Sequence, residues 1–162
     1  PGEYKNVYKS FLKDDTVYYV SEHRGSYTNK DEIKNLYFKN PDFVIFAISI
    51  TRFAAKKAIE DLFKEGIKVS LVNILWIKPL KISKKSYDNL KESKFGGVVM
   101  DDDYTTGVAK SIANDINIKT NKKMITMGLK DRTAGTAKRL DNLPPSSSEI
   151  YKRIKDIISS NV

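Results

Sequence analysis

The sequence has no cysteine, which excludes disulfide bonds, thiolate zinc sites and cysteine nucleophiles. It has no apolar run near the ~20 residues that cross a bilayer, and its opening PGEYKNVYKS lacks the apolar core of a signal peptide. From these absences we expect a cytoplasmic protein that does not enter a membrane. Because the first residue is not Met, we also expect the chain to be part of a longer polypeptide.

Nucleotide-binding glycine patterns are missing as well. The glycines in FGGVVM and GLKDRTAGTAKRL follow neither the GxGxxG pattern nor the GxxxxGK(S/T) pattern. Acids are too few to balance the bases, since the formal net charge is +9. The lysines stand singly or in pairs among acids, which is typical of solvated helix faces. A functional basic patch is the alternative.

The first 41 residues show weak but distinct patterns. Apolar residues from Tyr4 to Leu12 follow the i, i+3, i+4, i+7 spacing of an amphipathic helix. TVYYVSE at 16–22 is rich in β-branched and aromatic residues, which predicts a strand. Residues 23–41 are polar and contain glycine and proline, so we expect a connection in which IKNLYFK forms an edge strand.

From residue 42 onward, apolar runs of strand length alternate with helical spacing. Helix signals fall between the runs, with Gly66 at a C-terminal cap and Ser83 at an N-cap, and Ser146 and Glu149 stand at capping-box spacing. This alternation predicts an α/β domain with three layers, α/β/α, and a mostly parallel sheet. The predicted strands are 43–49, 68–77, 96–100 and 122–128.

Three consecutive acids, Asp101, Asp102 and Asp103, follow the strand predicted at 96–100. They would lie at the carboxyl edge of the sheet, where open α/β sheets bind ligands. Side chains alternate along an extended strand end, so the three cannot converge on one ion without a turn. We therefore expect solvated acids beside a helix start capped by Thr105 or Thr106, and no metal or catalytic site.

His23 and Arg24 are the other candidate functional residues. His23 is the only histidine, and no nucleophile can be tied to it by sequence. Arg24 stands beside Gly25 at the end of a predicted strand, where its guanidinium fork could bind a phosphate or carboxylate.

Several stretches together resemble a known family. They are FVIFAISITRFAAKKAIEDLFKEGIKVSLVNILWIKPL, GGVVMDDDYTTGVAKSIANDI, ITMGLKDR and the capped final helix. The order is similar to the C-terminal domain of transketolase-like, thiamine-diphosphate-dependent enzymes: transketolase, deoxyxylulose-phosphate synthase and the beta chain of 2-oxoacid dehydrogenase decarboxylases. The resemblance covers about residues 36–160. It implies a five-stranded sheet with one antiparallel edge strand, which IKNLYFK would supply.

The resemblance also covers the N-terminal stretch YKNVYKSFLKDDTVYYVSEHRGS, which looks like the end of the preceding pyrimidine-binding domain. It implies a boundary between residues 1–27, a helix and strand remnant of that domain, and residues 28–162. In these relatives an Arg near this point binds the anionic end of the substrate. Arg24 is the matching position, and His23 lies beside it as a second substrate-binding candidate.

One departure from the family limits the expected function. Nothing in the chain resembles the GDG…N motif that binds diphosphate and magnesium, and the cofactor-activating Glu is missing. We therefore expect no catalytic, cofactor-binding or metal residues here. Thiamine diphosphate and Mg²⁺ would belong to a complete transferase or oxidoreductase, a homo-oligomer such as a dimer, in which this domain serves assembly.

A protein of another class stays open as the alternative. It is a free-standing basic α/β module that binds nucleic acid or acidic proteins, and steeply salt-dependent binding would favour it.

Overall fold

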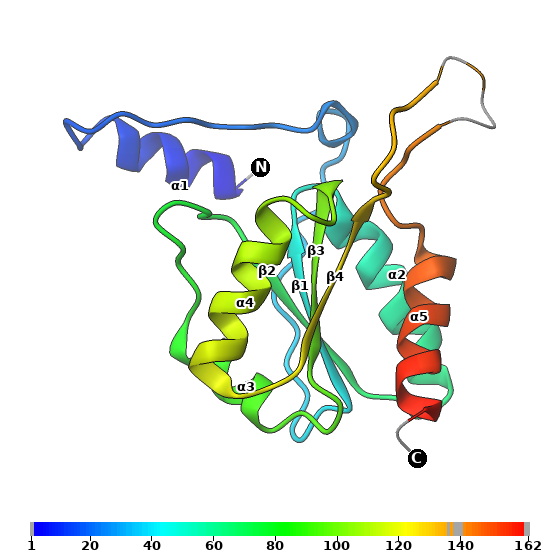
Figure 1. The fold of residues 1–162 in the computed structure, drawn as a ribbon. Coiled ribbons are helices and arrows are strands. Elements are labelled where there is room, and N and C mark those ends of the chain that lie inside the picture. The colour runs from blue at the N-terminus through cyan, green and yellow to red at the C-terminus, as the bar shows by residue number, and fades with distance from the viewer. Residues whose placement is uncertain (1, 136, 138–140, 161–162) are drawn as a thin grey trace. The chain divides into compact units, whose positions relative to one another are not determined.

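The computed structural model describes residues 2–135, 137 and 141–160. The chain forms two compact units, residues 1–33 and residues 34–162, and each is described by itself. Figure 1 shows the helices and strands in chain order. They are α1 (Gly2–Phe11), η1 (Arg24–Ser26), β1 (Phe43–Ile48), α2 (Thr51–Lys64), β2 (Val69–Ile74), α3 (Lys84–Lys91), β3 (Gly97–Tyr104), α4 (Val108–Thr120), β4 (Met124–Leu129) and α5 (Ser147–Ser159).

The first unit contains the predicted amphipathic helix, which is α1. The strand predicted at residues 16–22 is wrong, because this segment has no regular secondary structure. Its apolar side chains are open to solvent, with Val17 99% and Tyr19 93% exposed. High β-propensity describes how a side chain fits a pleated, half-buried surface, and the described part of this unit offers no strand to pair with.

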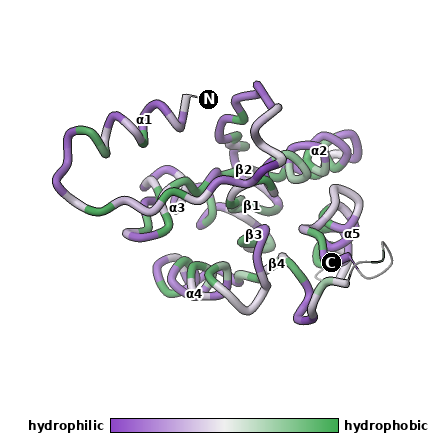
Figure 2. The backbone as a smooth tube through the Cα atoms, turned by 90° about the horizontal axis from the view of Figure 1, so that it is seen from above, coloured by the Kyte–Doolittle hydropathy of each residue, from purple (hydrophilic) through white to green (hydrophobic). Residues whose placement is uncertain are grey.

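The second unit confirms the predicted α/β architecture. Its four strands are all parallel and lie in the order β2-β1-β3-β4. Helices α2 and α5 cover one face of the sheet, and α3 and α4 cover the other (Figure 1; seen from above in Figure 2). Both faces are therefore buried, which is why the strand sequences are nearly continuous apolar runs.

The predicted fifth strand is reduced to a single bridge. Leu36 pairs antiparallel with Leu71 through two backbone hydrogen bonds of 2.8 Å. The ladder stops there because the next amide, that of Phe38, donates to the hydroxyl of Ser70 at 3.0 Å instead of to a backbone carbonyl. The sheet thus has four strands, and β2 is one of its two outer strands.

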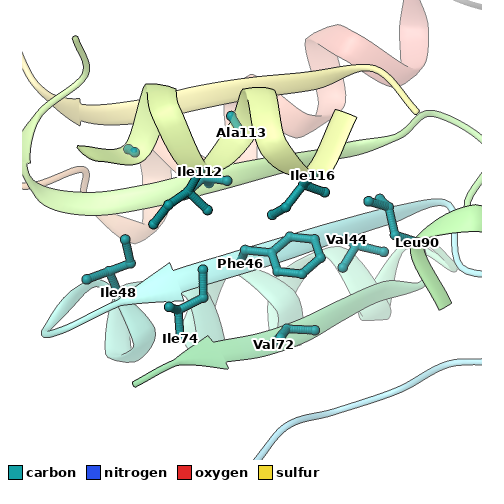
Figure 3. Packing of buried hydrophobic residues seen from close by; sticks show 11 residues of the cluster. Val44, Phe46, Ile48, Val72, Ile74, Leu90, Ile112, Ala113 and Ile116 are labelled. Carbon is teal, nitrogen blue, oxygen red and sulfur yellow. The ribbon is translucent and has the colours of Figure 1, made fainter. Parts of the chain in front are cut away.

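The core on the α3 and α4 side is built from alternate residues of β1. Val44, Phe46 and Ile48 point toward α4, where Ile112 and Ile116 meet them (Figure 3). The odd-numbered residues of the same strand are also buried, and by strand alternation they face the layer that contains α2 and α5.

Helix α5 is held against α2 by buried apolar side chains and by polar contacts at the surface. Ile150 and Ile154 are fully buried, and the helix packs against α2. On the exposed side, the carboxylate of Glu65 accepts hydrogen bonds from the Tyr151 hydroxyl and, at 2.6 Å, from the Lys155 ammonium group. The predicted capping box of Ser146 and Glu149 is present at the start of α5.

The predicted glycine cap closes α2. Gly66 has φ +80°, and its N–H donates to the carbonyl of Phe63 at 3.0 Å. The N–H of Ile67 donates to the carbonyl of Leu62 at 3.1 Å, so the pair forms a Schellman motif. Among the helices that the structure describes, none combines the length and the apolar character needed to cross a membrane.

Candidate functional site

His23 begins a short 3-10 helix in the first unit. Its Nδ1 atom accepts a hydrogen bond of 3.0 Å from the backbone N–H of Gly25. Its carbonyl accepts from the N–H and the hydroxyl of Ser26, at 2.9 and 2.6 Å. In the neutral imidazole, the hydrogen must therefore lie on Nε2. The ring is oriented by the turn, and Nε2 remains the donor that could reach a ligand.

Arg24 projects from the same turn. Its carbonyl is held by the N–H of Tyr27 at 3.2 Å, while its side chain is exposed. Within residues 2–135, 137 and 141–160, no ion pair or hydrogen bond engages its guanidinium group. The sequence placed Arg24 after a strand, whereas the structure places it after an irregular segment. The turn nevertheless presents a fork of donors suited to a carboxylate or phosphate.

A second place with polar side chains lies between β1 and β3. The chain leaves β1 toward β2 on one side and continues to β3 and β4 on the other, so these neighbouring strands flank the topological switch point. Ser49 follows β1 with φ +55°, and its hydroxyl donates to the carboxylate of Asp102 at 2.7 Å. The sequence did not indicate this contact, because its partners lie 53 positions apart.

The three acids differ from the prediction in position and in exposure. They lie within β3, which runs on to Tyr104, and Asp101 is only 5% exposed. Solvation therefore describes Asp103 and not Asp101. Burial, and after it the neighbouring Asp102, raise the pKa of Asp101 to about 6, while the N–H of Asp102 donates to its carboxylate and opposes the shift.

The helix after the acids is not capped as expected. Gly107 is the N-cap residue of α4 and provides no side-chain hydrogen bond, so neither Thr105 nor Thr106 caps the helix. Among the residues that the structure describes, no three His, Asp or Glu side chains are grouped to hold a metal ion. The switch point therefore combines one buried carboxyl group with one serine–carboxylate pair.

A hollow of about 550 Å³ lies between residues 37–39 and α3. Tyr37 forms a 2.9 Å hydrogen bond with Ser86, and the Lys85 ammonium group lies 4.4 Å from the Tyr37 ring centroid. The lining also contains Lys84, which pairs with Asp88 at 2.5 Å. Sequence reasoning missed this hollow, and none of the predicted site residues lines it.

Comparisons with known proteins agree on the second unit. The family model described as "Transketolase, C-terminal domain" matches residues 35–146. No curated protein sequence matches the chain.

Two similar solved structures share the fold. One is a split-gene transketolase in an inactive beta4 tetramer, with 17% identity and a TM-score of 0.59 over 78% of this chain. The other is a 2-oxoglutarate:ferredoxin oxidoreductase from Magnetococcus marinus with 2-oxoglutarate, coenzyme A and succinyl-CoA bound, with 18% identity and a TM-score of 0.53 over 79% of this chain. The chain spans 41% and 19% of the lengths of those two chains.

Proposed function

Because the chain belongs to the family of transketolase C-terminal domains, we propose that it is the C-terminal, non-cofactor-binding portion of a thiamine-diphosphate-dependent enzyme. The observation that carries the proposal is the family match over residues 35–146, which coincides with the parallel sheet and its covering helices. In the complete enzyme, a transketolase-type transferase or a 2-oxoacid dehydrogenase, this domain serves assembly and subunit contacts. Thiamine diphosphate and Mg²⁺ bind elsewhere in that enzyme.

Calorimetry tests the cofactor part of the proposal. Titration of the 162-residue chain with thiamine diphosphate and Mg²⁺ should give no heat of binding, because a diphosphate needs a metal held by acid and amide oxygens. Micromolar cofactor binding would contradict the proposal. The gene should also adjoin, in frame or as a neighbour, a segment that encodes the diphosphate motif.

The first unit supports a connection to a preceding domain. Residues 1–27 are proposed as the end of a pyrimidine-binding domain. Along the chain, the first compact unit extends a little further and ends at Ile33. Leu12, Val17 and Tyr19 are at least 80% exposed, and several exposed apolar side chains in one short segment support docking against a partner. The missing sheet of the pyrimidine-binding domain is the partner that the family offers.

Arg24 is proposed as a contact for the anionic end of the substrate, with His23 beside it. The support is local: the guanidinium group is exposed on a hydrogen-bonded turn, and the turn fixes Nε2 of His23 as the neutral ring's donor. A carboxylate or phosphate could accept from both side chains. The remaining walls of such a pocket would come from the rest of the enzyme.

Kinetics of the complete enzyme test this contact. Arg24→Ala should raise the KM for an anionic substrate by about tenfold or more, since a hydrogen bond to a charged group contributes roughly 1.5–3 kcal/mol. Arg24→Lys should restore the KM only partly, because Lys loses the bidentate fork. Lys30→Ala, which removes another exposed cation of the first unit, is the matched control and should leave the KM unchanged. Wild-type kinetics in both Arg24 variants would remove Arg24 from the site.

A further inference from the structure

The two edges of the sheet are finished in different ways. At the β2 edge, Leu36 exchanges both backbone hydrogen bonds with Leu71, and the side chain of Asn35 accepts from the N–H of Asn73 at 2.8 Å. These contacts occupy outward backbone groups of β2, so residues 35 and 36 block the addition of another strand there. The opposite edge is β4, the last strand in the order β2-β1-β3-β4.

Hydrogen bonding fixes which backbone groups of β4 face outward. The carbonyl of Lys123 accepts from the N–H of Gly97 at 3.0 Å, and the carbonyl of Leu129 accepts from the N–H of Thr105 at 3.2 Å. Odd-numbered residues therefore turn their backbone groups toward β3, and strand geometry turns those of the even-numbered residues away. The even-numbered residues of β4 are Met124, Thr126 and Gly128.

The next outward residue shows how this edge accepts a partner. The side-chain amide of Asn142 accepts from the N–H of Lys130 at 3.0 Å and donates to its carbonyl at 2.8 Å, as a neighbouring strand would. Across the described ranges, nothing plays this part for residues 124, 126 and 128. The open ladder therefore covers β4 and ends where Asn142 begins.

The open edge also lacks the usual protection against strand addition. Natural edge strands are blunted by charged side chains, proline or bulges. The β4 sequence MITMGL has no charge and no proline, and all six of its residues are partly exposed. The register irregularity beside it is assigned between Met100 and Tyr104 of β3, and not to β4. An extended peptide would meet a mostly apolar edge that pairs in regular register with β3 from Met124 to Met127, whereas at Gly128 the strand closely approaches the backbone of Asp103.

Charge at the two ends of β4 identifies the occupant. Lys123 and Lys130 flank the strand and both are exposed. Neither forms an ion pair within the part of the chain that the structure describes, although the charge of Lys130 contributes to lowering the pKa of Glu149. The two lysines stand about 23 Å apart along an extended chain. Only even-numbered residues of β4 face outward, so a second copy paired antiparallel about Thr126 would set Lys122 of each copy opposite Lys130 of the other, and opposed like charges destabilise such pairing.

From this edge and its charges, we propose that β4 is a docking site for an extended segment of another polypeptide that carries acidic residues at both ends. Main-chain hydrogen bonds to Met124, Thr126 and Gly128 hold the segment, and its acids pair with Lys123 and Lys130. This is recognition by strand addition, in which backbone bonds supply affinity and the flanks supply specificity. The proposal rests on the β4 edge alone and not on the proposed function.

A synthetic peptide tests the site on the 162-residue chain. The probe is fluorescently labelled Glu-Glu-Thr-Val-Thr-Val-Thr-Glu-Glu, followed by anisotropy, and its Lys-flanked counterpart is the charge control. The acidic peptide should bind saturably, and the Lys-flanked peptide should bind about tenfold more weakly or worse. Thr126→Pro removes one outward N–H without breaking a bond to β3, and it should weaken binding by about tenfold. Thr126→Val keeps that N–H and should bind like the wild type.

Four outcomes would overturn the proposal. The first is no binding of the acidic peptide at about 1 mM, and the second is equal affinity for the acidic and the Lys-flanked peptides. The third is undiminished binding of the acidic peptide to a folded Thr126→Pro variant. The fourth is a dimer of the chain that Thr126→Pro dissociates, which would make the occupant a second copy. If Thr126→Pro fails to fold, the wild-type protein is tested with a peptide N-methylated at alternate residues, which lacks the N–H groups that would bond to β4. Its binding should be lost, and retained binding would also overturn the proposal.

Discussion

Asp101 is a carboxyl group whose ionisation opposes folding. It lies in a strand with both faces covered, and Asp102 and Asp103 follow it directly. Burial and the adjacent negative charges raise its pKa from the ordinary value of 3.8 to about 6. The folded state therefore holds a proton more tightly than the unfolded state. Each unit of such a shift corresponds to about 1.4 kcal/mol, so near pH 7 the ionised form lowers the free energy of unfolding by up to about 3 kcal/mol.

Asp101→Asn should therefore stabilise the protein at pH 7. The amide carries no charge, and its oxygen can still accept from the N–H of Asp102. In the wild type, the stability from the raised pKa is present below pH 4 and is lost as the pH rises to about 6. The free energy of unfolding of the variant, from urea titrations, should exceed the wild-type value by about 1–3 kcal/mol at pH 7, and the gap should shrink toward pH 4.

The exposed neighbour provides the control for this experiment. Asp103→Asn removes the same charge from a side chain that solvent reaches, so it should leave most of the pH dependence in place. An Asp101→Asn variant that is less stable than the wild type at pH 7 would show that the carboxylate has a stabilising partner.

Helix α5 begins at a capping box whose parts satisfy one another. The hydroxyl of Ser146 accepts from the N–H of Glu149 at 3.3 Å, and the carboxylate of Glu149 accepts from the N–H of Ser146 at 2.9 Å. The Ser146 hydroxyl also donates to that carboxylate at 2.7 Å, and the backbone N–H of Ser146, followed by this hydroxyl, lowers the pKa of Glu149. The stability that they contribute is present above the ordinary pKa of that carboxyl group and is lost as the pH falls through the lowered value.

Ser146→Ala should lower the free energy of unfolding by about 1 kcal/mol at pH 7, because it leaves helix donors without a partner. Ser146→Asp is the matched control, since Asp caps helices as well as Ser does, and it should retain nearly the full stability. Urea-induced unfolding followed by circular dichroism measures both variants. Equal stability of all three proteins would mean that water replaces the cap without cost.

At the scale of elements, the sequence predicts well wherever the signal is local. Gly66, Ser83 and the Ser146 box all mark helix ends that the structure has, because caps are satisfied within one turn. The strand predicted at residues 16–22 was wrong because a strand depends on a pairing partner, which no local pattern reveals.

The candidate site was less predictable for the same reason. The burial of Asp101 and its pKa depend on what packs over the end of β3, and the bond between Ser49 and Asp102 joins distant positions. By contrast, the position of His23 and Arg24 in a turn follows from the polar, Gly-containing sequence around them. Tertiary packing decides burial, whereas turn chemistry decides local backbone geometry.

The whole molecule joins a self-sufficient sheet domain to a first unit rich in exposed apolar side chains. The second unit has its own core on both faces of the sheet, so we expect it to fold without residues 1–33. The first unit has one described α-helix and no strand. Exposed apolar surface of this kind recruits a partner, and in isolation the available partner is another copy of the chain.

The 162-residue chain should therefore self-associate, whereas residues 34–162 alone should remain monomeric and fold with nearly the same melting temperature. Light scattering measures the mass of both proteins, and calorimetry measures the melting temperatures. Replacing Val17 and Tyr19 with Ser in the full chain should reduce association without changing the melting temperature, since both side chains are almost fully exposed. A strictly monomeric full chain would contradict the association, and an unfolded 34–162 fragment would contradict its independence.

The fastening of α5 onto α2 has a consequence during synthesis on the ribosome. The Glu65 carboxylate bonds to Tyr151 and Lys155, which follow it by 86 and 90 positions. At typical elongation rates of about 5–20 residues per second, the apolar stripe of α2 waits roughly 4–18 s before Ile150 and Ile154 are translated to cover it. During that interval the nascent chain exposes the apolar face of α2 that α5 later covers. Chaperone binding should therefore concentrate on α2 and end when α5 emerges.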